Sequence, residues 1–584
     1  MEVDQSQGIR SDSILMKKYR QYLLPSILTS LALALNEFVD SMILSNMLGS
    51  DALAIANMGY PIIFVIAACY VLLGNGGSTL YALYLGAWDT VRAGKVFRLS
   101  MYLAVLLGLA VVLFGWIFSG PFTTILCADE GLREAYTSYY HVMLFTAPIL
   151  IVLLTCVCFL PPSGAPVYAT IVNIVSNVLN LVMDVVFIKV LGFGVEGAAY
   201  ATIVGYLVGA GLLIFYIISG KVNIKNEKID VFDTSLTPLI VTQGAATALL
   251  QICYAFKYSV SNQLAVEYGG RTGVVGFSLC LQTFSIACVF LLGIADTAQP
   301  LLAMLAGQRD FKGQADVMKR SLQLQTLFSL ILTAFFIVFP QAIIFAYGVD
   351  QPDMVELGIQ GIRLFAFTYL PRGISIQFLR FFQVEGRRKY AFAVGLMDGL
   401  FVIPLGYFLA DSFGTDGVYM SYPAAAILMF VIIFITNIII YNNNRESFSN
   451  ILLIRKDVGS ISTINTTITD TNEDISAISE GMIDFCSENG LSAKQAMRVG
   501  LMCEEMAVYT QHHRRDTGDI DILLRVREKD IDISFRSIGE PFDPTHRTED
   551  DSEENLMLLQ TMTNRLSYDY IMGMNNTLIQ IARQ

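Results

Sequence analysis

The chain has 584 residues, of which 54% are hydrophobic and only 15% are charged, and its formal net charge is −12. Soluble proteins carry about 25% charged residues, so the surplus of apolar residues excludes an ordinary soluble protein and indicates a protein that spans a bilayer. Much of the acid lies after Arg455 and in short loops, which gives no reason to expect a nucleic-acid partner.

Twelve apolar segments follow one another along the chain, each long enough to cross a hydrocarbon core of about 30 Å as a helix. They span approximately residues 22–48, 52–80, 96–119, 138–160, 165–190, 195–219, 236–262, 273–297, 321–346, 358–382, 390–411 and 416–440. Lys and Arg gather in alternate connecting loops, which predicts a multi-pass plasma membrane protein with both termini in the cytoplasm. The expected fold class is an all-α polytopic membrane protein.

The membrane part repeats itself with an offset of about 220 residues. Leu85–Asp89 resembles Ala306–Asp310, and Phe193–Gly197 resembles Phe413–Gly417. The offset covers an even number of helices, namely six. Two six-helix halves in the same orientation are therefore expected, with a substrate site between them.

The composition changes after Tyr441. The next 35 residues are rich in Asn, Ser and Thr and are predicted to be a linker, and the remainder alternates helical and strand patterns typical of a small cytosolic α/β domain. Helices are expected over 477–489, 493–512 and 554–566, and strands over 520–527, 531–536 and 577–581. The predicted parts are an N-terminal six-helix lobe (1–219), a C-terminal six-helix lobe (220–440), the linker (441–475) and the cytosolic domain (476–584).

Polar side chains within the apolar segments give the strongest indication of function. Asn180 and Asp184 share one helix face at the spacing i, i+4, and Asp40, Asp184 and Thr202 each lie about eight residues, or roughly 12 Å, from the outer end of a helix. These four residues are expected to converge in the outer half of the first lobe. Two adjacent carboxylates do not both ionise cheaply, so either one holds a proton or a cation such as Na⁺ lies among Asp40, Asn180 and Asp184. The alternative is a buried structural hydrogen-bond network.

The second lobe lacks this cluster, because the equivalent positions near Val402–Gly406 are apolar or glycine. It carries Lys257 and Asp398 instead, which either pair, line a central cavity or reach toward the ends of their helices. Glu37 on the first segment is a further candidate for a cavity-lining acid.

The membrane part resembles the multidrug and toxic compound extrusion (MATE) family over about residues 15–440. The likeness rests on Asn36-Glu37-Phe38-Val39-Asp40, Asn177–Asp184, Gly192–Ala199 and Gln299-Pro300. It implies a secondary active antiporter that exports cationic or amphipathic organic compounds in exchange for H⁺ or Na⁺, without another cofactor. By this resemblance Asp40, Asn180, Asp184 and Thr202 form the coupling site. One departure lies in Leu160–Pro166, which lacks the basic residue that the family usually carries before Gly-x-Pro.

Residues 476–584 resemble the GHKL ATPase fold, and within it the anti-sigma-factor serine kinases. The likeness rests on the acidic pair Glu504-Glu505 and on Arg536–Pro544, which contains Gly539, Phe542 and Asp543. The nucleotide site is degenerate, because the family's adenine-binding Asp aligns with Ser537, its Mg²⁺-bridging Asn with Tyr509, and its glycine-rich lid with Glu553–Leu556, which has no glycine.

ATPase or protein kinase activity is therefore not expected of this domain, since phosphate binding needs glycine-rich backbone and no negative charge. A rival hypothesis makes the chain a membrane-bound signalling protein whose residues 476–584 bind a cytosolic protein partner.

Overall fold

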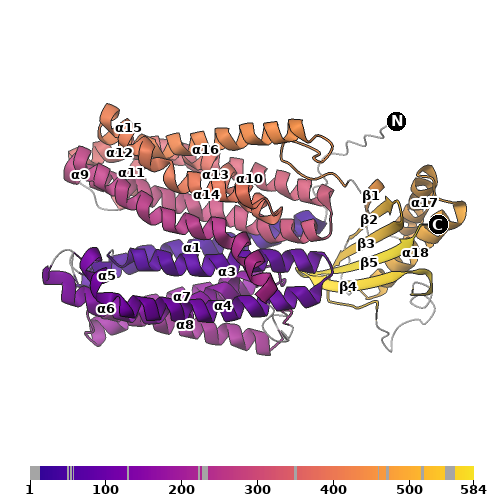
Figure 1. The fold of residues 1–584 in the computed structure, drawn as a ribbon, viewed down its shortest axis with the longest axis horizontal. Coiled ribbons are helices and arrows are strands. Elements are labelled where there is room, and N and C mark those ends of the chain that lie inside the picture. The colour runs from indigo at the N-terminus through magenta and orange to yellow at the C-terminus, as the bar shows by residue number, and fades with distance from the viewer. Residues whose placement is uncertain are drawn as a thin grey trace.

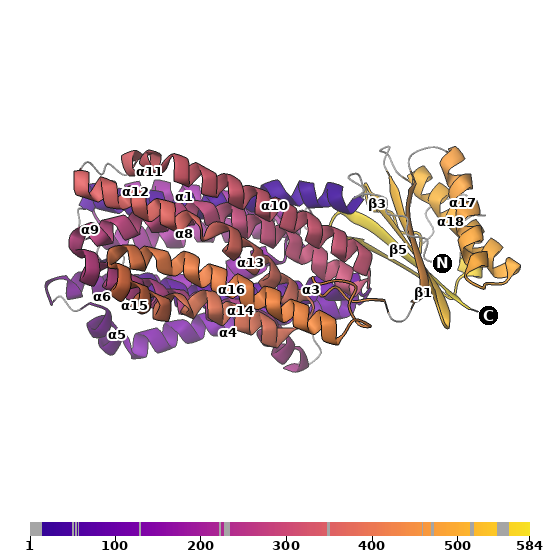
Figure 2. The same ribbon diagram turned by 90° about the horizontal axis from the view of Figure 1, so that it is seen from above.

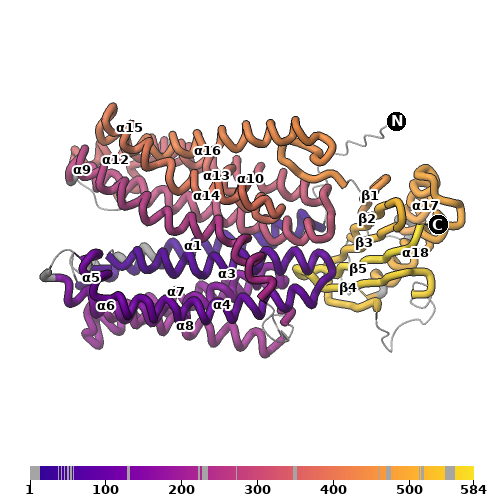
Figure 3. The backbone as a smooth tube through the Cα atoms, in the orientation of Figure 1, coloured from indigo at the N-terminus to yellow at the C-terminus, as the bar shows by residue number. Residues whose placement is uncertain are grey.

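The computed structural model describes residues 14–48, 52, 55–56, 58–127, 130–220, 224–226, 234–346, 351–457, 460–468, 472–513, 519–545 and 560–583. Two lobes of long helices lie side by side, and a five-stranded sheet with two helices lies against one end of both (Figure 1). Figure 2 shows the same elongated shape from above, and Figure 3 traces the chain from the first lobe through the second to the sheet. We call the end of the lobes beside the sheet the sheet end, and the opposite end the far end.

Each lobe is built from helices that run between the two ends. The first lobe contains α1 (Ile14–Leu48), α3 (Tyr60–Gly86), α4 (Thr90–Ile117), α5 (Ser119–Leu126), α6 (Glu130–Cys158), α7 (Pro166–Val185) with the π-helical turn η1 (Val186–Val190), and α8 (Val195–Ile218). The second lobe contains the 3₁₀ turn η2 (Thr234–Leu236), α9 (Thr237–Gly307), α10 (Phe311–Val338), α11 (Pro340–Ala346), α12 (Pro352–Ala366), α13 (Tyr369–Val384), α14 (Arg388–Leu400), α15 (Val402–Phe413) and α16 (Thr415–Asn443).

Ten helices in the described part of the chain are long and apolar enough to cross a membrane. The long helix α9 supplies two of them, because its backbone leaves the helical conformation at Gly270, where φ is +54°. The expected count of twelve is not confirmed, since the segments 22–48 and 358–382 are not among the ten. The second of these is divided between α12 and α13, and the division places Pro371 in the first turn of α13, where no backbone N–H is needed.

The internal repeat predicted from the sequence appears in the backbone. Asp89 and Asp310 both cap a helix, accepting hydrogen bonds from the amides of Arg92 and Gly313 at 2.9 Å. The residues before them also match, because Trp88 and Arg309 have positive φ values of 62° and 55°. Near the far end, the glycines that precede α8 and α16 share one conformation: Gly194 has φ 64° and ψ −144°, and Gly414 has φ 60° and ψ −136°.

The two lobes are in backbone contact near the sheet end, where α3 meets α9. A methyl group on Gly86 would overlap the carbonyl oxygen of Met304, and one on Gly307 would overlap that of Leu83. Gly76 and Gly244 form a second contact of the same kind, a few turns farther into the bundle. Only glycine permits so close an approach of two helices, so this end of the bundle is closed by direct packing.

The C-terminal domain is a small antiparallel sheet with helices on one face. Its strands are β1 (Ser460–Ile468), β2 (Ile520–Arg527), β3 (Asp530–Ile538), β4 (Arg565–Ile571) and β5 (Met574–Ala582), in the order β1-β2-β3-β5-β4, with α17 (Asn472–Glu488) and α18 (Ala493–His513). A GHKL fold is not established by this sheet, and the resemblance stays a prediction.

Two strands differ from the sequence-based expectation. β1 lies within the expected linker and pairs with β2 along its length; its polar residues alternate with only three isoleucines, so the apolar signal is weak. β4 begins at Arg565, inside the helix expected over 554–566. Of that stretch the structure describes residues 560–566, and only 560–562 of these are helical. Pairing with β5 therefore overrides the local helical pattern at Arg565 and Leu566.

The sheet face opposite α17 and α18 points at the sheet end of the lobes, and we call it the docking face. It carries polar and charged side chains that are each at most 6% exposed, namely Asp521, Arg525, Asp532, Arg536 and Asn576. Arg536 Nη1 lies 2.7 Å from Asp310 Oδ2. Burial acts to raise the pKa of Asp310, but the Arg536 guanidinium and the Gly313 amide outweigh it and hold that pKa below its usual value. The pair is therefore ionised at neutral pH.

Gly244→Ala is expected to lower the free energy of unfolding by about 1–3 kcal/mol, because overpacking a close helix contact costs that much. The added methyl group would overlap the Leu72 carbonyl oxygen across the lobe boundary. Thermal or denaturant unfolding of the purified protein measures the effect. Gly211→Ala on α8 is the matched control, since no atom lies within 4 Å of a Cβ there; an equal loss in both variants would contradict the interlobe contact.

Candidate functional site

Two acidic side chains meet inside the first lobe. Asp184, near the far end of α7, is fully buried, and its carboxyl group lies against that of Asp40 on α1. Apart from this neighbour, neither Asp184 oxygen receives a hydrogen bond from a described residue. Two adjacent buried carboxyl groups require a shared proton or an intervening cation, because two bare negative charges would repel in a medium that screens poorly.

Neutral oxygens lie beside this pair. Asn180, one turn before Asp184, donates from Nδ2 to Thr202 Oγ1 on α8 at 3.3 Å, and Thr202 Oγ1 donates to the Ala198 carbonyl at 2.9 Å. α8 approaches closely because a methyl group on Gly205 would press on the Ser176 carbonyl and on Asn180. The structure thus brings together Asp40 with Asp184 and Asn180 with Thr202. The side chain of Glu37, the other acid expected here, lies outside the described residues.

Tyr139 on α6 belongs to the same cluster, although nothing in the sequence singles it out. Its side chain is 5% exposed and lies within electrostatic range of both Asp40 and Asp184. A buried tyrosine hydroxyl is a donor that can bond a carboxylate. The packing of α6 against α1 and α7 brings Tyr139 to this cluster. The sequence does not indicate it, because a single tyrosine in an apolar helix is usually a packing residue.

Unpaired polar atoms continue from this cluster along the boundary of α1 and α7. Asn177 Nδ2 and Asn36 Oδ1 are buried without a hydrogen-bond partner among the described residues. Nearer the sheet end, Thr29 Oγ1 lies 2.9 Å from Thr170 Oγ1. Polar groups thus recur along this boundary, which suits the passage of water, a proton or a small ion between apolar helices.

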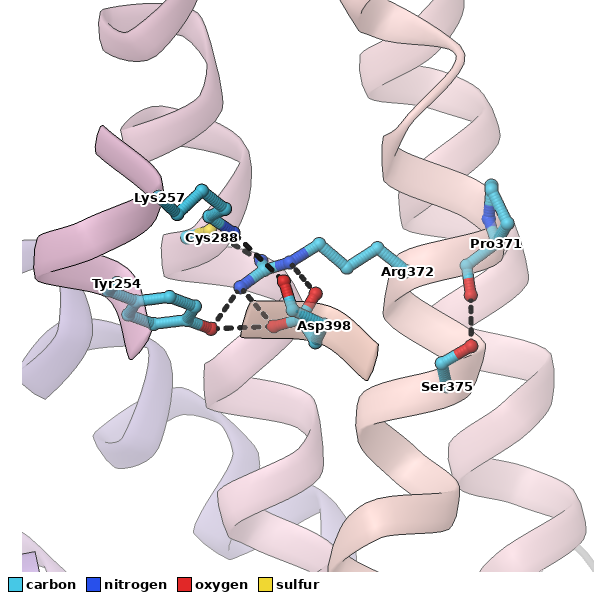
Figure 4. A network of polar contacts seen from close by, with 7 residues as sticks. All are labelled: Tyr254, Lys257, Cys288, Pro371, Arg372, Ser375 and Asp398. Atoms are coloured by element: carbon cyan, nitrogen blue, oxygen red, sulfur yellow. Dashed lines mark hydrogen bonds and ion pairs between the residues drawn. The ribbon is translucent and has the colours of Figure 1, made fainter. Parts of the chain in front are cut away.

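A second buried polar cluster lies in the second lobe (Figure 4). Arg372 on α13 and Asp398 on α14 form a two-pronged ion pair, with Nε 3.1 Å from Oδ1 and Nη2 3.3 Å from Oδ2. The Tyr254 hydroxyl donates to Asp398 Oδ2 at 2.8 Å and accepts from Arg372 Nη2 at 2.6 Å. Every polar atom in this triangle has a partner, which is the condition for keeping charges in a protein interior.

Lys257 lies beside this triangle but does not pair with the Asp398 carboxylate. Its Nζ donates to the backbone carbonyl of Asp398 at 3.2 Å, and it lies 4.5 Å from the ring centroid of Tyr254 and 5.4 Å from that of Tyr422. Aromatic faces stabilise a cation electrostatically. The cavity lined by Lys257 and Asp398 holds only about 10 Å³, so it admits a water molecule and no organic substrate.

The apolar segments of the second lobe hold two ion pairs, namely Asp398 with Arg372 at 3.1 Å and Asp296 with Arg380 at 2.8 Å. The charges within each pair cancel, and Lys257 adds a positive charge beside the first pair. The two lobes therefore differ in buried polarity, since the first holds adjacent acids and the second a net positive group.

A larger cavity of about 190 Å³ lies between the lobes toward the sheet end, bounded by α1, α3, α7 and α9. Its wall is mostly apolar, and the polar side chains in it include Thr29, Asn75, Thr79 and Gln299. Asp296 also faces it, with 46% of its side chain exposed. The space is adequate for water or a small ion, and it reaches the polar boundary of α1 and α7 through Thr29 and Thr170.

Aromatic rings gather around Phe542, one of the residues expected at a nucleotide site in the C-terminal domain. Phe542 lies 6.0 Å from Tyr509 and 6.1 Å from Tyr568 between ring centroids, and Tyr509 stacks on His513 at 4.1 Å. Tyr509 holds the position at which the family resemblance requires an asparagine.

The polar groups expected at that site are engaged or unclustered. Asp543 accepts hydrogen bonds from the amide and hydroxyl of Thr545 at 2.8 and 2.5 Å. Glu504 and Glu505 are half-buried on α18, and Gly539 follows the last residue of β3. No group of three or more His, Cys, Asp or Glu within the described ranges could hold a metal ion. The expected lid, residues 553–556, lies outside these ranges.

Comparisons with known proteins agree on the membrane part. A family model described as MatE matches residues 25–186 and 246–408. The multidrug export protein MepA of Staphylococcus aureus (strain MSSA476) is 24% identical over 64% of this chain and 82% of its own length, and that of Staphylococcus haemolyticus (strain JCSC1435) is 22% identical over 70% and 90%.

Solved structures share the fold. One, described as an outward-facing conformation of a multidrug resistance MATE family transporter, has a TM-score of 0.70 at 20% identity and covers 76% of this chain and 99% of its own. A transporter of the MOP superfamily from Pyrococcus furiosus has a TM-score of 0.69 at 21% identity and covers 75% and 99%.

Arg372→Gln is expected to lower the free energy of unfolding by about 3–5 kcal/mol, because it leaves the buried Asp398 carboxylate without its cation. Arg380→Gln is the matched control and should cost less, since Asp296 is partly exposed and water replaces the lost partner. Denaturant unfolding in detergent micelles measures both. Replacing Arg372 and Asp398 together by leucine should cost less than the single change; equal losses for Arg372→Gln and Arg380→Gln would contradict this account of the network.

Proposed function

Since the chain belongs to the MatE family of membrane transporters, we propose that it is a secondary active antiporter. It exports cationic or amphipathic organic compounds and takes up H⁺ or Na⁺ in exchange. The relatives named multidrug export protein MepA support the export of drugs. The proposed orientation has twelve membrane-crossing segments in the plasma membrane with both termini and the sheet in the cytoplasm, as the distribution of Lys and Arg favours.

The observation that carries the proposal is the pair Asp40 and Asp184. Neither Asp184 oxygen receives a hydrogen bond from the described residues although the side chain is fully buried, and a group so placed costs several kcal/mol unless a proton or cation satisfies it. Asn180 and Thr202 add neutral oxygens that suit Na⁺ as well as a proton network. No separate cofactor enters this scheme.

The proposed mechanism is alternating access in which α1 couples ion binding in the first lobe to the opening of the substrate path. α1 packs on α7 within its own lobe and also on α9 of the other, where Ile27 lies against Gly293. When a proton or Na⁺ binds from outside, the repulsion between the two acids is removed, and α1 repacks so that substrate leaves outward. Release of the ion to the cytoplasm resets the site. Thr29 and Thr170 mark the exit route toward the sheet end.

The C-terminal domain is not proposed to hydrolyse ATP or to phosphorylate proteins. This proposal is supported by the aromatic rings that pack around Phe542 and by Ser537 and Tyr509, which align with nucleotide-binding residues of the family that it resembles. The alternative, a membrane-bound signalling protein that acts through this domain, predicts a cytosolic protein captured by the full-length chain and no change in drug tolerance when the gene is deleted.

Asp40→Asn and Asp184→Asn are each expected to reduce export of a fluorescent organic cation such as ethidium at least tenfold, because the amide can neither hold the exchanged proton nor pair with Na⁺. The measurement is efflux from cells or uptake into inverted membrane vesicles, normalised to the amount of inserted protein. Asp353→Asn, at an exposed position on α12, is the matched control and should export normally. Normal efflux by Asp40→Asn would remove the coupling role.

Imposed gradients identify the ion. Inverted vesicles that carry either a pH gradient or a Na⁺ gradient, with the other held at zero, should accumulate the probe in response to one of them. The response should disappear in Asp184→Asn, because the ion acts at that carboxyl group. Accumulation without either gradient would contradict the antiport mechanism.

A further inference from the structure

The docking face of the sheet is buried, although it carries charged side chains instead of apolar ones. On the opposite face, alternate residues such as Ile522, Ile533 and Ile579 pack into a core with α17 and α18. The docking face therefore is not a second core of the domain. It is covered because the ends of the two lobes lie on it (Figure 1).

Its contacts with the second lobe converge on the turn between α9 and α10. Arg536 Nη2 donates to Gln308 Oε1 at 2.6 Å, in addition to its ion pair with Asp310. Arg525 Nη1 donates to the Gln308 and Arg309 carbonyls at 2.9 and 3.3 Å. Strands β2 and β3 thus bind the α9–α10 turn through several hydrogen bonds, and a small displacement of the turn from the sheet would break them together.

The domain contacts the first lobe at the start of β2, where Asp519 pairs with Lys17 at 2.6 Å, and at the turn between β4 and β5. The Tyr22 hydroxyl of α1 donates to the Met572 carbonyl at 3.1 Å. The next residue, Gly573, touches the loop before α7, since a methyl group on Gly164 would lie 2.7 Å from the Gly573 nitrogen. Beside this turn, Lys225 in the connection between the lobes pairs with the buried carboxylate of Asp569 at 3.2 Å.

The sheet therefore bridges both lobes at the end where α3 and α9 are already in contact. We propose that the C-terminal domain is a clamp that holds this end of the transporter closed and must detach before the end opens to take up substrate. The inference rests on the proposed alternating-access exporter, because a clamp of this kind acts only on lobes that separate. It makes the domain a built-in brake on the export rate.

The chemistry of the docking face suits repeated release. Arg525, Asp532 and Arg536 are solvated by water once exposed, whereas an apolar face of the same size would resist detachment or aggregate. The buried apolar side chains at this contact include Ile571, Met572 and Met574 of the β4–β5 turn and Leu523 of β2. A detached domain keeps its own core against α17 and α18 and is ready to dock again.

The test uses the full chain in proteoliposomes with a release variant, Arg525→Gln/Arg536→Gln, which leaves the lobes unchanged. Export of the fluorescent cation should rise at least threefold, and amide hydrogen exchange at residues 571–574 should become at least tenfold faster. The matched control, Lys494→Gln/Lys529→Gln, removes the same charge from exposed positions of the domain and should change neither readout.

Lys225→Gln provides a second variant at the other side of the bridge, should the double variant fold poorly. It should accelerate exchange at residues 571–574 and raise export in the same direction, by at least twofold. Faster exchange at the turn with unchanged or slower export would overturn the clamp. So would a docking turn that is unprotected in the parent protein.

The two proposals fail in different ways. The clamp is wrong and the exporter is supported if the parent exports, Asp40→Asn does not, and the release variant exports at the parent rate. The exporter is wrong, and with it the role of the clamp in transport, if neither the parent nor any variant exports.

Discussion

The first lobe depends on the cost of keeping two carboxyl groups side by side among apolar helices. Asp184 is fully buried and touches Asp40, and the polar groups near the pair include Asn180, Thr202, Tyr139 and Tyr206. A bundle that needed stability alone would have no use for such a pair. The energetic need of this pair for a proton or small cation is the basis of the proposed exchange of ion for substrate.

The second lobe also buries charged groups, but there the protein itself supplies their partners. Arg372, Asp398 and Tyr254 satisfy one another completely, and the ammonium group of Lys257 lies among aromatic faces. Such a closed network holds α9, α13 and α14 in one arrangement and has no need of an external ion. The halves thus differ in their buried polar groups: adjacent acids lie in the first lobe and a satisfied ion-pair network in the second. The glycine contacts of α3 and α9 permit the two lobes to pack closely against each other.

Much of the membrane part could be predicted because long apolar segments, loop charges and the 220-residue repeat are each strong local signals. The proximity of Asp40 to Asp184 also followed from helix geometry, since depth can be counted at 1.5 Å per residue. Depth along a helix does not say which helices are neighbours, so the sequence alone did not identify Arg372 on α13 as the partner of Asp398. Short strands such as β1 and β4 were missed because their polar residues mask the alternation and only sheet pairing selects them. The covering of the docking face by the lobes left no trace in the sequence, because its charged residues look like any solvated strand.

The order of synthesis along the chain determines when the docking face can bind the lobes. The groups that receive it extend from Ile14 to Asp310, so all of them are synthesised and inserted long before Arg536 leaves the ribosome. Domains generally fold as units from the N-terminus onward, and the sheet can therefore dock only on lobes that are already assembled with the correct spacing. The first docking thus follows assembly of the membrane part and precedes any release that accompanies transport.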